Sequence, residues 1–337
     1  MSITRATKGK VLGSGVLFLI LALLPTVVKS PYYMHLAIMT CDNIILGLSF
    51  SLLYSTGLLT MAAGAFWGIG AYTSALLVVK AGLSFWIALP LSGMCSVLIA
   101  LGTGAVITRI PGIAFLIQTM VISLIIPEVV GYSEFLGGWG GLLGIPGPGS
   151  IGPLRFVGKT PYYYLVVVLL MLNVLAFAAL YSSRVGRAWR SIRVNAQLAE
   201  TLGINLYRFR LLAFVISSAS AGLAGSFYAH YFQALEPGMF TAFKSINVQI
   251  FAILGGLNYY VVGPAVGAAI MTFVPELLRV GKEIEPVITG AVLILLVIFL
   301  PGGVLSLPER LGSFSWGLMR RAKSDEVPAK PGLHKGD

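Results

Sequence analysis

Two glycine-rich stretches come closest to the residue patterns that bind nucleotides. Residues 147–152 have the G-x-G-x-x-G spacing of a dinucleotide loop, but such a loop follows a strand and opens a helix. Pro146 and Pro148 disfavour the strand, and Pro153 follows the last glycine directly. Residues 158–160, Gly-Lys-Thr, resemble the end of a phosphate-binding loop, whose first glycine would stand where the chain has Pro153. We therefore expect no ATPase or dinucleotide site in this chain.

The side chains that usually ligate metals or act as nucleophiles are scattered. His35, His230 and His334 stand alone, without an H-E-x-x-H pattern or a Cys pair, so a metal site is not expected. Cys41 and Cys95 lie in apolar runs, which argues against a structural disulfide. No G-x-S-x-G nucleophile elbow occurs. These residues predict a protein that is not an enzyme and holds no cofactor or metal of its own.

The composition indicates the solvent around these residues. Of 337 residues, 57% are hydrophobic and 10% are charged, whereas soluble domains carry about 25% charged residues. The mean hydropathy is +0.90, and apolar runs recur at about 20 residues, the length of a membrane-spanning helix. We predict an all-α, polytopic membrane helical bundle with about 8 to 10 transmembrane helices, some of them broken or re-entrant.

Ten apolar runs are candidate membrane spans. The first follows three basic residues, as in a signal peptide, but lacks the small-residue cleavage pattern, so we expect a retained helix. The run 246–258 is too short to cross comfortably, and the divisions within 36–79 and 246–278 stay open. The candidates are residues 11–28, 36–56, 57–79, 83–107, 112–130, 163–181, 211–234, 246–258, 261–278 and 286–300.

Basic residues set the expected orientation. With the N-terminus in the cytoplasm, the cytoplasmic segments hold 3 basic residues in the N-terminal tail, 1 at the Arg109 turn, 6 in the 184–210 loop and 6 in the C-terminal tail. That is 16 of the 23 Lys and Arg residues, as the positive-inside rule requires. Ten crossings place both termini in the cytoplasm. Topology thereby explains the net charge of +11, and we expect no nucleic-acid partner.

Two domains follow from this topology. Residues 1–308 form the transmembrane domain, and 309–337 form a basic cytoplasmic tail that is expected to be disordered. Basic residues of the tail, Arg320, Arg321 and Lys323, would lie near anionic membrane lipid. On the outer side, the loop 131–161 includes eight glycines and two prolines within 137–152, so that stretch cannot form a regular helix.

The loop 184–210 has the clearest periodicity outside the spans. Apolar residues recur every three or four positions, which predicts a short helix with one apolar stripe and Gly203 as its C-terminal cap. Such a helix either lies on anionic lipid or docks on a cytoplasmic ATPase subunit, and the pattern alone favours lipid. The stripe consists of Trp189, Ile192, Ala196, Ala199 and Leu202. The other face has Arg187, Arg190 and Arg193, near Glu200.

Small residues recur at helical spacing within the spans, which lets helices approach closely. The pairs are Gly64 and Gly68, Gly70 and Ser74, Ala221 and Gly225, Gly222 and Ser226, and Gly263 and Gly267.

Three blocks of sequence, 56–77, 186–231 and 255–279, and a weaker one at 137–146, carry a family resemblance. The chain resembles the branched-chain amino acid permease family of bacterial ATP-binding cassette (ABC) importers, specifically its second, longer permease type. Together the blocks span most of residues 40–305.

The resemblance implies a complex in the bacterial inner membrane. A second homologous permease subunit, two cytoplasmic ATPase subunits that use the ATP, and a solute-binding protein would accompany this chain. Ala199, Glu200 and Gly203 match the family's ATPase-contacting signature, which favours a coupling role for the 184–210 loop. The solute would be a branched-chain or hydrophobic amino acid or a similar small molecule. The alternative is a stand-alone channel or facilitator for a small polar solute such as urea or a short amide.

Several positions depart from the family pattern. Ala62 and Ala63 replace a glycine–histidine pair, Asn247 replaces a frequent carboxylate, Leu124 replaces a glutamate, and Leu136 replaces a threonine. The outer loop also has Trp139-Gly140 in place of a more polar pair. Because these changes remove polar groups from expected solute-facing regions, urea, short amides and aromatic acids stay open as solutes.

Polar residues within the spans are the candidates for the translocation path. Such groups seek each other or water, so each either lines a path or forms an interhelical hydrogen bond, and the sequence leaves both open. Asp42 and Glu128 are the carboxylates that could face a polar cavity. The path candidates are Asp42, Asn43, Gln118, Thr119, Asn247 and Gln249.

Overall fold

The computed structural model describes residues 30–149 and 158–277, together with 303–306 and the single residues 25, 156, 290 and 294. Apart from those single residues, the candidate spans 11–28 and 286–300 lie outside the described residues, and so does the tail 309–337.

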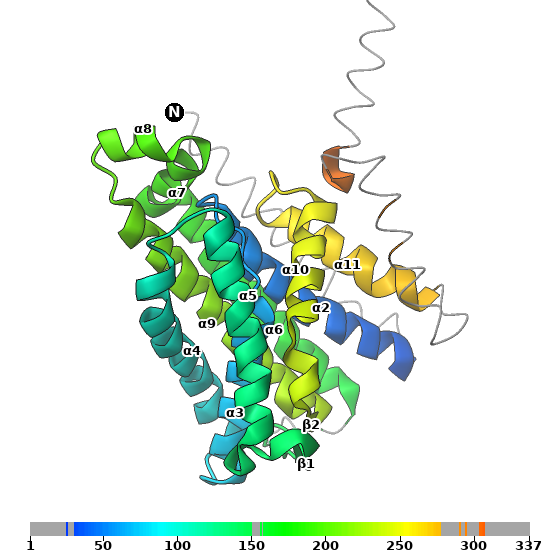
Figure 1. The fold of residues 1–337 in the computed structure, drawn as a ribbon. Helices are drawn as coiled ribbons and strands as arrows, with labels where there is room; N and C mark the ends of the chain where they lie inside the picture. The colour runs from blue at the N-terminus through cyan, green and yellow to red at the C-terminus, as the bar shows by residue number, and fades with distance from the viewer. Residues whose placement is uncertain are drawn as a thin grey trace, which may run out of the picture.

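The described part of the chain is a bundle of helices, and the all-α polytopic prediction is confirmed (Figure 1). Five helices are long and apolar enough to cross a membrane: α2 (Pro31–Tyr54), α4 (Phe85–Ile107), α5 (Ile113–Tyr132), α6 (Lys159–Ser182) and α9 (Leu206–Phe232). Three shorter apolar helices complete the bundle: α3 (Ala63–Val79), α10 (Ala242–Gly255) and α11 (Val262–Leu277).

Short elements close the two ends of the bundle. At one end lie α7 (Arg184–Val194) and α8 (Ala196–Thr201) (Figure 1). At the other end, β1 (Leu142–Leu143) pairs antiparallel with β2 (Ala234–Leu235). The 3-10 turns are η1 (Glu134–Leu136), η2 (Gly138–Gly140), η3 (Pro237–Phe240) and η4 (Val304–Ser306). We call the first end the basic end and the second the glycine-rich end.

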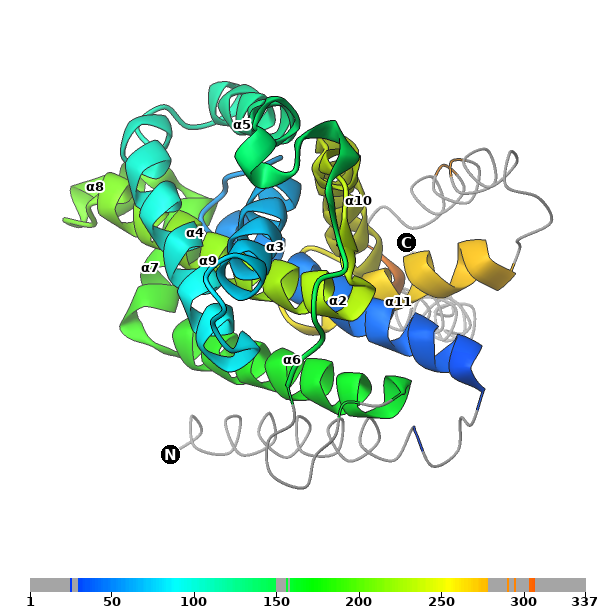
Figure 2. The same cartoon turned by 90° about the horizontal axis from the view of Figure 1, so that it is seen from below.

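Helix α9 is the central helix of the bundle, with α2, α3, α4 and α6 packed around it (Figure 2). Glycines permit the closest crossing, between α9 and α3. A Cβ at Gly70 would lie 2.5 Å from the Gly222 carbonyl carbon, and a Cβ at Gly225 would lie 2.8 Å from that of Trp67. The interpretation of these small residues as packing contacts is therefore confirmed.

Two helix boundaries differ from the sequence prediction. The run 57–79 is helical only from Ala63, because residues 55–62 form an irregular segment in which Gly57 has a φ of +79°. The helix expected over 186–203 is two helices, because Asn195 is extended (φ −155°, ψ 105°). The Asn195 side chain accepts a hydrogen bond from the Leu198 N–H at 3.0 Å, so it caps α8 and makes the break a stable feature.

The cap at Gly203 is confirmed. Gly203 has a φ of +82°, and its N–H donates to the Glu200 carbonyl at 2.9 Å. The Ile204 N–H donates to the Ala199 carbonyl at 3.1 Å, which completes a Schellman-type end. The expected stripe ends before this cap: Trp189, Ile192 and Ala199 are buried, whereas Leu202 is 73% exposed.

Candidate functional site

Helix α7 is held against the bundle by one large side chain. Trp189 is fully buried, and its indole N–H donates to the Phe209 carbonyl near the start of α9 at 2.9 Å. The Ser183 hydroxyl caps the helix by accepting from the Val185 N–H at 3.1 Å. The anchored side of α7 thus agrees with the apolar face expected from sequence.

The other side of α7 and α8 presents a mixed surface, which we call the coupling surface. Its apolar members are strongly exposed: Val194 by 87%, Leu198 by 59% and Leu202 by 73%. Its charged members, Arg187, Arg190 and Glu200, are exposed beside them in the sequence. Exposed apolar side chains flanked by charges are typical of a surface that meets another protein or a membrane. The sequence pattern did not reveal Val194 and Leu198, because they lie off the expected stripe.

Arg193 differs from the other arginines of α7 because it points into the protein. Its guanidinium lies 4.3 Å from the Tyr54 ring centroid and donates to the Tyr260 hydroxyl at 2.8 Å. It also donates to the Asn258 side-chain oxygen at 3.2 Å. Arg193 therefore joins α7 to the end of α2 and to the turn between α10 and α11.

A second group of polar contacts fixes the irregular segment between α2 and α3. The Met61 N–H donates to the Thr119 hydroxyl at 3.0 Å, and the Gln249 amide donates to the Thr60 carbonyl at 3.1 Å. The Ser123 hydroxyl donates to the Met61 carbonyl. Thr119 and Gln249, two path candidates, are thus brought together as backbone partners from α5 and α10.

A third group lies at the first turn of α10. The Lys244 ammonium donates to the Asn43 side-chain oxygen at 2.9 Å and lies 4.5 Å from the centroid of the Trp67 ring. Asp42 is 1% exposed and interacts electrostatically with Lys244. Asn43 in turn donates to the Thr272 hydroxyl at 3.1 Å. The structure thus joins Asp42 and Asn43 through Lys244, which sequence reasoning missed because it precedes the apolar run 246–258.

Two path candidates stand apart from these groups. The side-chain oxygen of Gln118 is buried without a hydrogen-bond partner. Asn247 is exposed on α10, three residues after Lys244. Since Lys244 meets the middle of α2, Asn247 also lies at membrane depth.

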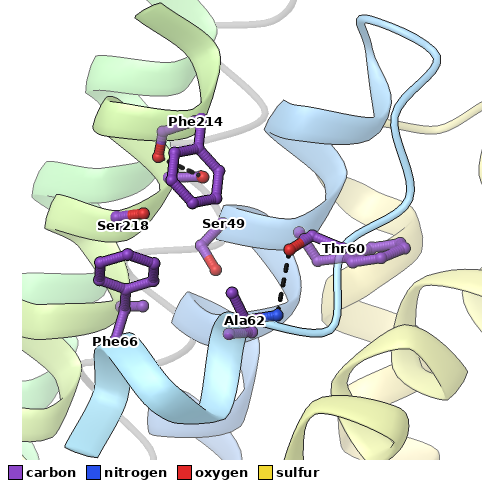
Figure 3. A pocket seen from close by; sticks show the side chains of 10 residues that line it. Ser49, Thr60, Ala62, Phe66, Phe214 and Ser218 are labelled. Atoms are coloured by element: carbon purple, nitrogen blue, oxygen red, sulfur yellow. Dashed lines mark hydrogen bonds between the residues drawn. The ribbon is translucent and has the colours of Figure 1, made fainter. Parts of the chain in front are cut away.

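A small hollow lies between α2, the start of α3 and α9 (Figure 3). Its cavity volume is about 10 Å³, which is about the space that one water molecule needs. Ser49, Ser218 and Thr60 contribute hydroxyls to its wall, and Phe66 and Phe214 contribute rings (Figure 3). Such a site can hold water beside the irregular segment, but it is too small to define a solute site.

At the glycine-rich end, His230 connects the loop between α5 and α6 to the α3–α9 crossing. Its Nδ1 lies 2.6 Å from the Pro146 carbonyl, which can only accept, so Nδ1 carries the proton. Its Nε2 therefore accepts from the Ser74 hydroxyl at 2.9 Å, and Ser226 donates to Ser74 at 2.8 Å. The histidine that is isolated in sequence is thus a buried structural link in space.

Comparisons with known proteins bear on the whole described bundle. Residues 32–301 match the family described as "Branched-chain amino acid transport system / permease component". The chain is 31% identical over 316 residues to the high-affinity branched-chain amino acid transport system permease protein LivM of Salmonella typhimurium, covering 85% of this chain and 74% of that protein. It is also 31% identical over 319 residues to LivM of Escherichia coli, covering 86% and 74%.

A second type of permease matches a shorter part of the chain. The permease protein LivH of Escherichia coli is 31% identical over 150 residues, covering 43% of this chain and 47% of that protein. No solved structure matches the chain.

Proposed function

We propose that this chain is a membrane permease subunit of an ABC importer in the bacterial inner membrane. The chain belongs to the family of branched-chain amino acid transport permeases, and the proposal starts from that membership. The cargo is a branched-chain or hydrophobic amino acid or a similar small solute. Relatives named as high-affinity branched-chain amino acid permeases support this choice. A solute-binding protein delivers the cargo, and separate ATPase subunits, which use the ATP, drive its import.

The coupling surface is the proposed ATPase contact. Val194, Leu198 and Leu202 give it apolar area, and Arg187 and Arg190 give it positive charge. Ala199 and Gly203 support this surface from within, because Ala199 is buried and Gly203 ends α8. In this proposal the basic end and both chain termini lie in the cytoplasm, and the glycine-rich end lies outside.

The second permease subunit is proposed to cover the exposed face of α5 and α10. Along α4, and between Tyr163 and Tyr181 of α6, the exposed side chains are apolar or aromatic, as lipid requires. Helices α5 and α10 instead expose Glu128 and Asn247. Because lipid cannot satisfy such groups, they belong against another protein subunit or a wet path.

The path candidates then divide into two sets. Asn247 and Gln118 suit the path itself, since Asn247 is exposed and Gln118 has an unsatisfied oxygen. Asp42, Asn43, Thr119 and Gln249 hold helices in place. Transport then requires no covalent step in this chain. ATP acts through the difference in stability between an outward-open and an inward-open arrangement of the two permeases.

The family match over residues 32–301 carries the proposal. The test is gentle purification of the native complex from membranes, identification of its subunits, and reconstitution in vesicles. We expect a second permease and two ATPase subunits to co-purify, and uptake to require ATP and a binding protein. Competition by leucine, phenylalanine, urea and acetamide assigns the solute class. Full-rate uptake by vesicles holding only this chain, without ATP, would support the channel alternative instead.

A further inference from the structure

The guanidinium of Arg193 occupies an aromatic cage at the basic end of the bundle. It lies 4.3 Å from the Tyr54 ring centroid and 5.5 Å from that of Tyr260. It donates to the Tyr260 hydroxyl at 2.8 Å, to the Asn258 side chain at 3.2 Å and to the Leu257 carbonyl at 3.5 Å. One side chain of α7 is thereby bound to two other segments.

Further contacts make this cage rigid. The Tyr181 ring, at the end of α6, stacks on Tyr260 with 5.0 Å between centroids. The Ser51 hydroxyl of α2 donates to the Tyr260 carbonyl at 2.8 Å. A Cβ at Gly57 would lie 3.6 Å from the Arg193 Cα, so the irregular segment after α2 also passes close to α7.

The cage suits arginine for a chemical reason. A planar guanidinium can stack on aromatic rings while its N–H groups donate in several directions, which a lysine ammonium cannot match. Three bonds to one turn and a ring on another helix therefore hold Arg193 in one orientation. Arg187 and Arg190, on the same helix, are exposed.

We propose that Arg193 is the positioning residue that transmits movement of α7 to the helices of the membrane domain. The inference rests on the proposed function and separates Arg193 from the ATPase contacts of the coupling surface. A displacement of α7 is passed through Arg193 to the turn at 256–261. That turn joins α10, whose other contacts, Lys244 and Gln249, hold α2 and the irregular segment. Movement at the basic end thus reaches the residues at membrane depth.

The experiment compares variants of the reconstituted complex, measuring uptake and ATP hydrolysis in the same vesicles. For Arg193→Gln we expect the ATPase subunits to remain bound and hydrolysis to continue, while solute moved per ATP falls about tenfold or more, since hydrogen bonds to a charged group are lost. Tyr260→Phe removes one of these bonds and should lower the ratio a few-fold. In Arg193→Lys the amount of solute moved per ATP should lie between the values for Arg193→Gln and the unchanged protein. Arg184→Gln, which removes an exposed charge at the start of α7, is the matched control and should leave the ratio unchanged.

Two results would overturn the inference. One is an unchanged ratio of uptake to hydrolysis in Arg193→Gln. The other result has two parts: the ATPase subunits dissociate from Arg193→Gln, and the ratio of uptake to hydrolysis is normal in Tyr260→Phe. Together these would show that Arg193 is a docking residue. If Arg193→Gln fails to reach the membrane, Tyr260→Phe serves as the test instead. An unchanged ratio of uptake to hydrolysis in Tyr260→Phe would then refute the proposed role of Arg193. Failure of the proposed function is distinct, because the unchanged complex itself would then show no ATP-dependent uptake.

Discussion

Replacing Gly225 with alanine tests whether the α3–α9 crossing sets the stability of this bundle. The new Cβ would lie 2.8 Å from the Trp67 carbonyl carbon and 3.0 Å from the Ala71 nitrogen, and it would overlap the Trp67 carbonyl oxygen. Atoms of this kind normally approach to about 3.5–4.0 Å, so the helices would have to separate by roughly 1 Å. Because the obstructing atoms belong to a helix backbone, no side-chain rotation can relieve the overlap.

The expected cost follows from two opposing effects. Overpacking a well-packed core costs about 1–3 kcal/mol and sometimes more, and a backbone clash belongs at the upper end. Alanine gains about 0.5–1 kcal/mol over glycine in a helix interior. We therefore expect Gly225→Ala to lower the free energy of unfolding by about 2 kcal/mol or more.

The matched control is Gly102→Ala on α4. Gly102 is exposed and a Cβ there would meet nothing within 4 Å, so only the helix gain remains and stability should hold or rise. Both variants can be followed by thermal unfolding in detergent, with size-exclusion chromatography reporting the fraction that stays monodisperse. If Gly225→Ala is as stable as Gly102→Ala, the close crossing does not limit stability and the packing argument is refuted.

Three further predictions concern other contacts. Lys244→Met should destabilise the protein by about 1–3 kcal/mol, because it removes the charged hydrogen bond to Asn43 and the cation that interacts with the buried Asp42. In a thermal-unfolding cycle the double variant with Asp42→Asn should lose less than the sum of the two single losses, and additive losses would contradict the pairing. Trp189→Ala should lower the free energy of unfolding by about 3–5 kcal/mol. In limited proteolysis, residues 184–205 of this variant should be cleaved before the rest of the chain, and an unchanged cleavage pattern would show that Trp189 does not anchor α7. Gly203→Ala forces alanine to a φ of +82°, which should distort the end of α8. This variant should therefore have a lower rate of solute-stimulated ATP hydrolysis than Gly102→Ala. Equal rates in the two variants would show that the end of α8 does not matter for coupling.

The course of the helices could be read from the sequence because lipid imposes a simple requirement. A helix must present apolar side chains over about 20 residues, and the observed bounds of α4, α5 and α6 differ from the predicted runs by only a few residues. The break before α3 left no such signal. Residues 57–62 are as apolar as the helix that follows, and the hydrogen bonds that stabilise the irregular backbone come from Thr119 and Gln249, far away in sequence.

The polar residues could be found by type but not by role. Asp42 and Asn43 were recognisable as polar groups in an apolar run, yet their partner Lys244 lies 201 positions from Asn43. The partners of His230 were equally hidden in the sequence, because Ser74 and Pro146 contact it only when α3 and the loop between α5 and α6 pack against α9. Pairing across the bundle depends on helix rotation, which a single sequence does not specify.

The arginines of α7 show how the fold divides a function that the sequence presents as uniform. Arg187, Arg190 and Arg193 recur every three residues and look alike in sequence, but only Arg193 lies over the turn at 256–261. The exposed pair is free to contact a partner, whereas Arg193 is hydrogen-bonded to Tyr260. Under the proposed function, Arg187 and Arg190 would bind the ATPase subunit, and Arg193 would transmit the movement of α7 to the turn before α11. Helix α7 has only 11 residues, so both roles would be close together on one short helix.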